Sequence, residues 1–154
     1  MTFYDGIDLL WTDDGDFCLG RNNDMADTSH DPLLAVAQDV YDRCKSDKGD
    51  YSELANIGAS LSDFVGEPNT RDNAKLIEKR TFNAMKVGGP ISPSDISLRS
   101  FPISKHTLGM VVTLAVQPTQ WNKKSQFIRM HLLYSYSENN VYPIGSNPLE
   151  EQLI

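Results

Sequence analysis

The feature that most constrains the fold is a change of hydrophobic period at Gly88-Gly89-Pro90. Before this tripeptide the apolar residues recur every three or four positions, which is typical of amphipathic helices. After it they alternate or run continuously, which is typical of strands. Gly followed by Pro ends a helix and prevents it from continuing. The chain is therefore expected to form its helices first and its main sheet afterwards, which is the α+β arrangement.

Three helices are expected before the glycines. The first starts after Asp31, an N-cap type of residue that is followed by proline at the first helical position. A shorter second helix is expected over residues 54–65, where apolar residues share one face, although Gly58 costs about 1 kcal/mol inside a helix. The third helix starts at Thr70, another N-cap type, and runs to about Val87.

Extended segments are expected on both sides of the helices. Residues 3–20 predict two short strands joined by the turn Asp13-Asp14-Gly15. The expected strands of the second half are residues 96–101, 108–116 and 127–136. The prediction is an α+β fold: a short N-terminal β element, three helices, then an antiparallel C-terminal sheet. A single domain over 1–154 would comprise an N-terminal β element and arm (1–30), a helical part (31–88), a sheet part (95–137) and a tail (142–154).

The balance of charges bears on the partners and the compartment. The formal net charge of -7 argues against nucleic acid, because binding to a polyanion depends on clustered Lys and Arg. No window approaches the roughly 18 apolar residues of a membrane span, and no signal-peptide pattern opens the chain. We therefore expect no nucleic-acid or membrane partner and folding in a cytoplasm. Cys18 and Cys44 are accordingly expected to be free thiols, with Cys44 a small core residue.

Metal-ligand patterns are absent from the sequence. His30, His106 and His131 lie far apart, and none has the spacing of a metal-binding pair. The acidic residues near the N-terminus could suggest calcium, but they lack the alternating ligands and the closing Glu of an EF-hand loop. These acidic residues are Asp13, Asp14, Asp16, Asp24 and Asp27. We interpret them as a hairpin turn with solvated carboxylates.

The sequence also contains little that indicates catalysis. Glu53, Glu67 and Glu78 lie in or near the helical part, so a carboxylate pair of the kind used by glycoside hydrolases is conceivable. No nucleophile elbow, P-loop or dinucleotide-binding glycine motif is present. The expectation is a protein that is not an enzyme, with no catalytic, cofactor-binding or metal-binding residues and no cofactor. The alternative is a small acidic cell-wall hydrolase.

The order of several short segments is more informative than any single residue. These segments are Gly15-Asp16-Phe17, Asp24-Met25-Ala26-Asp27-Thr28, Asp42-Arg43-Cys44-Lys45, Lys48-Gly49-Asp50 and the run over 56–70. Together they resemble the baseplate wedge family of contractile-tailed phages, whose relatives include a baseplate component of type VI secretion systems. Family members share a helix, a Gly-bearing loop, a G-x-x-L-x-D-like segment, a long helix and a strand hairpin. The resemblance covers roughly residues 5–117 and is most specific over 42–70.

The resemblance implies a structural role in sheath initiation. Family members surround the tail tube in the baseplate and present strands that the first ring of sheath subunits extends. The implied partners are other wedge proteins and the tail sheath and tail tube proteins, with several copies around a symmetric tail. The implied location is the virion tail baseplate, after assembly in the host cytoplasm. The equivalent type VI secretion component is the alternative setting, and the cell-wall hydrolase of the alternative above would be tail-associated.

Segments of this chain can be assigned to these contacts. We expect sheath contact at the edge of strand 126–136, and wedge contact at the third helix and its following loop. Proline at Met130 or Leu132 is expected to remove a backbone donor from that edge. Many family members carry Glu-Pro-Arg after the long helix, where it helps to dock the protein onto the wedge. This chain has Gly88-Gly89-Pro90-Ile91 there, so that docking role is assigned to no residue.

Overall fold

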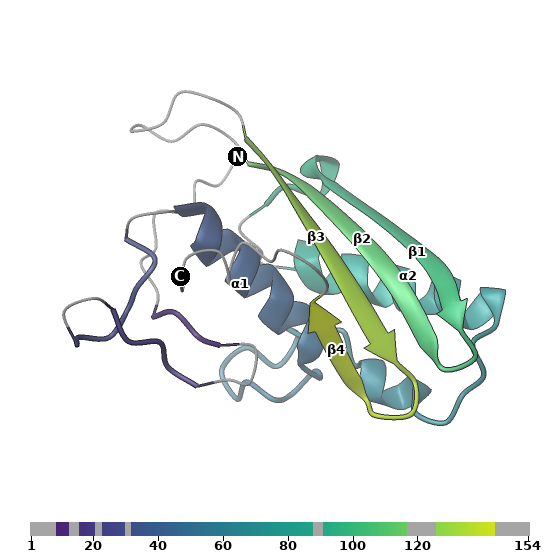
Figure 1. Ribbon diagram of the computed structural model, residues 1–154. Helices are drawn as coiled ribbons and strands as arrows, with labels where there is room; N and C mark the ends of the chain where they lie inside the picture. Colours follow the sequence, from purple (N-terminus) through teal and green to yellow (C-terminus); the bar gives the residue numbers. More distant parts are fainter. Residues whose placement is uncertain are drawn as a thin grey trace.

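The computed structural model describes residues 9–12, 16–20, 23–29, 32–87, 91–116 and 126–143 (Figure 1). Its two α-helices are α1 (Pro32–Lys45) and α2 (Arg71–Lys86), and its two short 3-10 helices are η1 (Leu61–Phe64) and η2 (Pro93–Asp95). Its strands are β1 (Ile96–Ser104), β2 (Thr107–Val116), β3 (Gln126–Ser135) and β4 (Asn140–Pro143).

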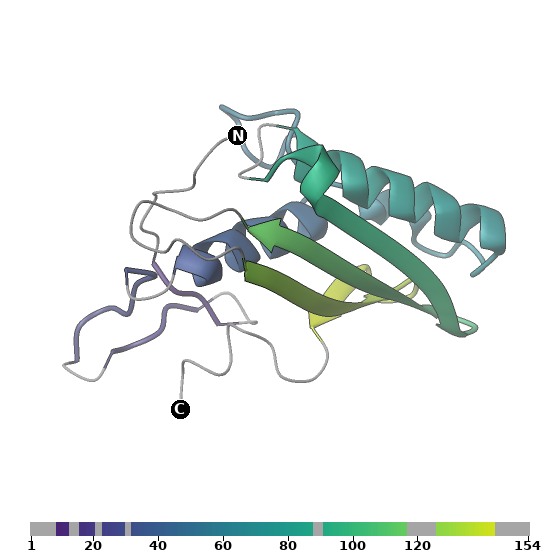
Figure 2. The same cartoon turned by 90° about the horizontal axis from the view of Figure 1, so that it is seen from above.

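The four strands form one antiparallel sheet in the order β1-β2-β3-β4. Both α-helices lie on the same face of this sheet, and the two views agree on it (Figures 1 and 2). Strand residues alternate between the two faces; the even-numbered ones of β1, β2 and β3, and Val141 of β4, point toward the helices. Along β3, for example, Ile128, Met130 and Leu132 are buried, whereas Phe127, Arg129 and His131 are exposed.

The main core fills the space between the helices and the inner face of the sheet. Two buried tyrosines connect the layers through their hydroxyl groups. Tyr134 of β3 donates to the carbonyl of Leu61 at 2.6 Å, and Tyr41 of α1 donates to the carbonyl of Val141 at 2.9 Å. Buried hydroxyl groups need such partners, since an unpaired one would carry its full desolvation cost. These hydrogen bonds therefore attach η1 to β3 and β4 to α1.

The N-terminal β element packs against the first half of α1. Within the described residues it consists of three isolated antiparallel bridges, Leu9–Asp27, Trp11–Phe17 and Leu19–Met25. Its small core contains Leu10, Cys18 and Leu34. The buried amide of Gln38 joins this element to α1, because it accepts from Trp11 N–H at 3.1 Å and donates to the carbonyl of Leu9 at 2.9 Å. The turn expected at 13–15 lies outside the described residues.

The prediction of three helices is wrong, although the α+β arrangement is correct. Residues 54–65 form turns followed by η1, with no α-helix. Gly58 and Ser60 have φ values of 128° and 52°, which a right-handed helix cannot contain. The apolar spacing of this segment is helical, but Leu54 is exposed and only residues near Leu61 reach the core. The positive φ values turn the chain back onto Asp47 instead.

The sheet also has one strand more than expected. β4 begins three residues after the end of the expected sheet part (95–137), and its last two residues overlap the expected tail (142–154). It pairs with Leu132–Ser135 of β3 across a turn in which Asn139 has a φ of 49°. Asn tolerates this left-handed conformation better than most residues do. Residues 144–154 lie outside the described part of the chain.

Both cysteines are free thiols and both are buried. Burial raises the pKa of the Cys44 thiol from 9.0 to about 12, and it raises the pKa of Cys18 as well. Cys44 lies on the buried face of α1 with 1% of its surface exposed, as its place in the apolar stripe predicts.

The free energy of unfolding is expected to fall as the pH rises from 9 toward 12. The unfolded Cys44 thiol ionises near its ordinary pKa of 9.0 while the folded thiol keeps its proton, so stability is complete below that value and is lost above it. The loss is about 1.4 kcal/mol for each pH unit within this window. Tyr134 adds a loss of the same sign, because burial raises its pKa from 10.0 to about 12.

Urea unfolding at several pH values above and below 9 measures this effect. Cys44→Ala starts from a lower stability, but it should lose less of it at high pH than the parent protein. Parallel pH profiles for the two proteins would show that the buried thiol is not the source.

Candidate interaction edge of the sheet

The outer edge of β1 is closed to a further strand. The backbone N–H of Ser100 points away from β2 and donates to the Glu78 carboxylate of α2 at 3.1 Å, while the Ser100 hydroxyl donates to the same oxygen at 2.7 Å. Pro102, the next outward position, has no N–H group, and the register shifts between Pro102 and Ser104. A capped donor, a proline and a bulge are the devices by which natural sheets prevent pairing at an edge.

The opposite side of the sheet is only half covered. β4 pairs with Leu132, Leu133, Tyr134 and Ser135, and Figure 1 shows it beside the C-terminal half of β3. The N-terminal half of β3 pairs with β2 on one side, and no described strand lies on its other side. We call the stretch Phe127–His131 the open edge.

The direction of the backbone groups along β3 follows from two hydrogen bonds near its end. Tyr136 N–H donates to the carbonyl of His106, in the turn that leads into β2, at 2.9 Å. The carbonyl of Ser135 points the other way and accepts from Asn139 N–H at 3.1 Å. Because these directions alternate in an antiparallel ladder, odd-numbered residues of β3 direct their N–H and C=O groups away from β2. In the open edge, the outward backbone groups of Phe127, Arg129 and His131 therefore have no strand partner among the described residues.

This alternation changes the choice of test positions within the strand. Met130 and Leu132, where the strand pattern alone suggested a proline, direct their N–H groups toward β2. Proline at either position would break the ladder inside the sheet and disturb a buried side chain. A proline that affects only the open edge belongs at an odd-numbered position.

The side chains at the open edge differ between its two faces. Ile128 and Met130 are buried at 4% and 3% exposure and belong to the core beneath the sheet. On the other face Arg129 and His131 are exposed, and Phe127 is 74% exposed. A strand added here would therefore meet an apolar core on one side and solvent on the other, which is the environment of an ordinary sheet strand.

The residues that suggested a metal site do not gather in the described structure. His106 lies in the turn between β1 and β2 and His131 lies on the outer face of β3, while His30, Asp13 and Asp14 lie outside the described residues. Asp24 and Asp27 accept local backbone bonds, from Met25 N–H at 2.8 Å and from Ser29 N–H at 3.0 Å. The described part of the chain contains no group of three His, Cys, Asp or Glu residues that could hold a metal ion.

The glutamates that suggested a hydrolase have separate places. Glu78 caps the edge of β1, whereas Glu53 and Glu67 are exposed in the loops around η1. A pocket of about 260 Å³ lies between the loop over 48–63 and the second half of α2. Asp63 is the single carboxylate among its lining residues, and it pairs with Arg80 at 2.6 Å. None of the three glutamates lines this pocket, which therefore lacks a carboxylate pair.

Within the described residues, no helix is long and apolar enough to cross a membrane. Comparison with protein-family models, curated proteins and solved structures finds no match to the chain. The features of the chain that bear on its function are therefore the geometry of its sheet edges and the order of its sequence segments.

Proposed function

We propose that this protein is a structural subunit of a contractile phage tail baseplate that docks on the wedge and initiates the sheath. The observation that carries the proposal is the open edge of β3, which stands opposite a closed edge on β1. The resemblance of residues 5–117 to the baseplate wedge family supports it, because that family implies strand addition by sheath subunits. The equivalent type VI secretion component would use the same edge with its own sheath protein.

The physical basis is β-augmentation. The unpaired backbone groups of the open edge are satisfied when a partner strand pairs with them, and the alternating side chains select the partner. With the β1 edge closed, strands are expected to add only on the β3–β4 side of the sheet. Because the β1 edge is closed, two copies cannot pair β1 against the open edge and form a continuous sheet.

The wedge contact is proposed on the exposed face of α2 and the loop that follows it. Leu76 on this helix and Val87 at its C-cap are 50% and 40% exposed, and the polar helix residues Lys75, Lys79 and Asn83 are exposed as well. Apolar side chains among polar ones on a helix are typical of the rim and centre of a protein interface. In this arrangement the subunit would contact the wedge through its helical layer and the sheath through its sheet.

Arg129→Pro is expected to abolish sheath addition while leaving the fold intact. The substitution removes an N–H group that points away from β2, so the ladder between β2 and β3 keeps its bonds. The measurement is co-assembly of the purified variant with purified tail sheath protein, followed by sedimentation and electron microscopy. Thermal unfolding of the variant alone checks that the sheet has formed.

Arg129→Ala is the matched control, because it removes the same side chain and keeps the backbone donor. It should retain sheath addition, with at most a weakened affinity. If the proline variant folds and still nucleates sheath as the parent does, the open edge is not the contact.

A further inference from the structure

The face of the sheet that points away from the helices has an apolar row across all four strands. Phe101, Gly109, Leu133 and Tyr142 occupy this row in register, one from each strand. A Cβ atom on Gly109 would come within 2.6 Å of the Phe101 ring and 2.9 Å of the Ile103 side chain, so these two side chains lie over the glycine. Phe101 and Ile103 remain 45% and 52% exposed. We call this side of the sheet the outer face.

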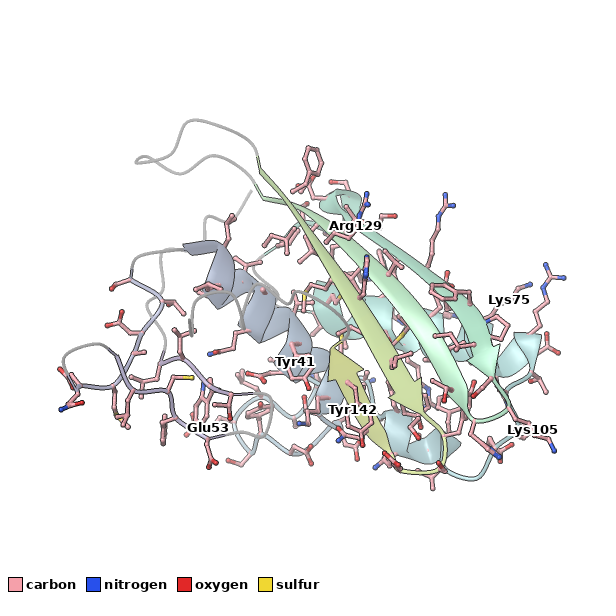
Figure 3. All side chains as sticks on the ribbon, viewed as in Figure 1. Tyr41, Glu53, Lys75, Lys105, Arg129 and Tyr142 are labelled. Carbon is pink, nitrogen blue, oxygen red and sulfur yellow. The ribbon has the colours of Figure 1, made fainter. Side chains whose placement is uncertain are left out.

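The charged side chains at the outward strand positions are arginines, and the Glu138 carboxylate in the turn before β4 contacts this face only through the Tyr142 hydroxyl. Arg99 and His131 share the row next to the apolar one, and Arg129 lies in the row beyond it. Figure 3 shows Arg129 on β3 and Tyr142 on β4, on the side turned away from the helices. The outward positions of the described strands include no Asp or Glu, although the whole chain has a net charge of -7.

The basic side chains of the outer face form no ion pair with an acidic residue in the described part of the chain. The ion pairs among the described residues are Arg43–Asp39 and Arg80–Asp63, and neither involves the sheet. Two arginines and a histidine without carboxylates, on an otherwise acidic protein, form a surface that is complementary to negative charge.

We propose that the strand accepted by the open edge is acidic on its outer side and apolar on its inner side. This inference rests on the proposed function and adds the chemistry of the partner. The side chains of an added strand alternate, so one set continues the layer of Ile128 and Met130 toward the core. The other set lies directly beside Arg129 and His131, where opposite charges on neighbouring strands are favoured and like charges are disfavoured.

A protein strand fits this surface better than a nucleic acid does. Binding to a polyanion requires a cation for each neutralised phosphate, and the outer face offers only three basic groups within its described residues. The exposed apolar groups beside them, from Phe127 at the open edge to Phe101 and Ile103, favour a partner that carries both carboxylates and apolar side chains.

Two synthetic peptides test the proposal on the intact protein. Both have about ten residues with Val and Thr at alternate positions, and they differ only in carrying two Glu or two Lys residues on the Thr side. Each is titrated into the isotope-labelled protein while NMR follows the backbone amides of Phe127–His131. The Glu peptide is expected to bind at these amides on the order of tenfold more tightly than the Lys peptide.

Charge reversal on the protein supplies the decisive comparison. Arg129→Glu should invert the preference between the two peptides, and thermal unfolding should be unchanged because Arg129 is exposed. Lys105→Glu makes the same change of charge in the exposed turn between β1 and β2, and it should leave the preference as in the parent.

The outcomes separate this inference from the proposed function. Equal binding of both peptides at the open edge would overturn the acidic partner and leave the edge standing. Binding of neither peptide at these amides would overturn both. Displacement of the Glu peptide by a short oligothymidine would overturn the choice of a protein strand in favour of a nucleic acid.

Discussion

Arg43→Met is expected to destabilise the protein by about 3 kcal/mol, because it removes a buried guanidinium that pairs with the partly exposed Asp39 and hydrogen-bonds two carbonyl groups. The Arg43 side chain is 6% exposed and pairs with Asp39 at 2.9 Å. The same guanidinium donates to the carbonyls of Ala84 and Val87 at 3.2 and 2.6 Å. A side chain of α1 therefore supplies hydrogen-bond donors to carbonyl groups at the C-terminal end of α2. Methionine fills a similar volume but leaves these acceptors without their donor. Urea unfolding measures the loss.

The exposed pair between Asp63 and Arg80 is the matched control. Its side chains are 62% and 41% exposed, and exposed ion pairs contribute less than about 1 kcal/mol. Asp63→Asn should therefore change the free energy of unfolding little. An Arg43→Met variant as stable as Asp63→Asn would contradict the role of Arg43 in joining the two helices.

Gly58→Ala is expected to cost at least about 3 kcal/mol, because strain from its backbone conformation adds to a steric overlap. Gly58 has a φ of 128°, and an added Cβ would lie 2.6 Å from the carbonyl carbon of Asp47. Because both groups are backbone, neither can move aside without shifting the loop. The change in the midpoint of urea unfolding, at unchanged slope, reports the cost.

Gly49→Ala separates the two contributions. Gly49 also has a positive φ, of 96°, but nothing lies within 4 Å of its added Cβ. It should therefore show only the conformational cost of about 1 kcal/mol. Equal losses for the two variants would mean that steric overlap with Asp47 adds nothing to the cost of Gly58→Ala.

The helices that the sequence predicted correctly have strong local signals at their ends. Pro32 is the first residue of α1. The Thr70 side chain caps α2 by accepting from Asn73 N–H at 3.2 Å. The missing helix at 54–65 has helical spacing without such an end signal. Its conformation is decided by Gly58 and Ser60 at positive φ and by packing on Asp47, which is a contact between distant parts of the loop.

The open edge was only partly predictable. The sequence indicates a strand at 126–136, but which of its edges is available depends on the strand order and on the length of β4. The turn before β4 had a local signal, the consecutive residues Asn139 and Asn140, which are common turn formers. Pro102 likewise indicated an edge strand. The capping of Ser100 by Glu78 joins residues 22 positions apart and could not be read from any local pattern.

Hydrogen exchange of the Arg129 and His131 amides, with and without purified tail sheath protein, tests the central claim most directly. In the protein alone these two amides should exchange quickly, while Met130 and Leu132 between β2 and β3 are protected. Addition of sheath protein should protect Arg129 and His131 as well. If these two amides stay unprotected while the sheath protein binds elsewhere, the open edge of β3 is not where the sheath begins.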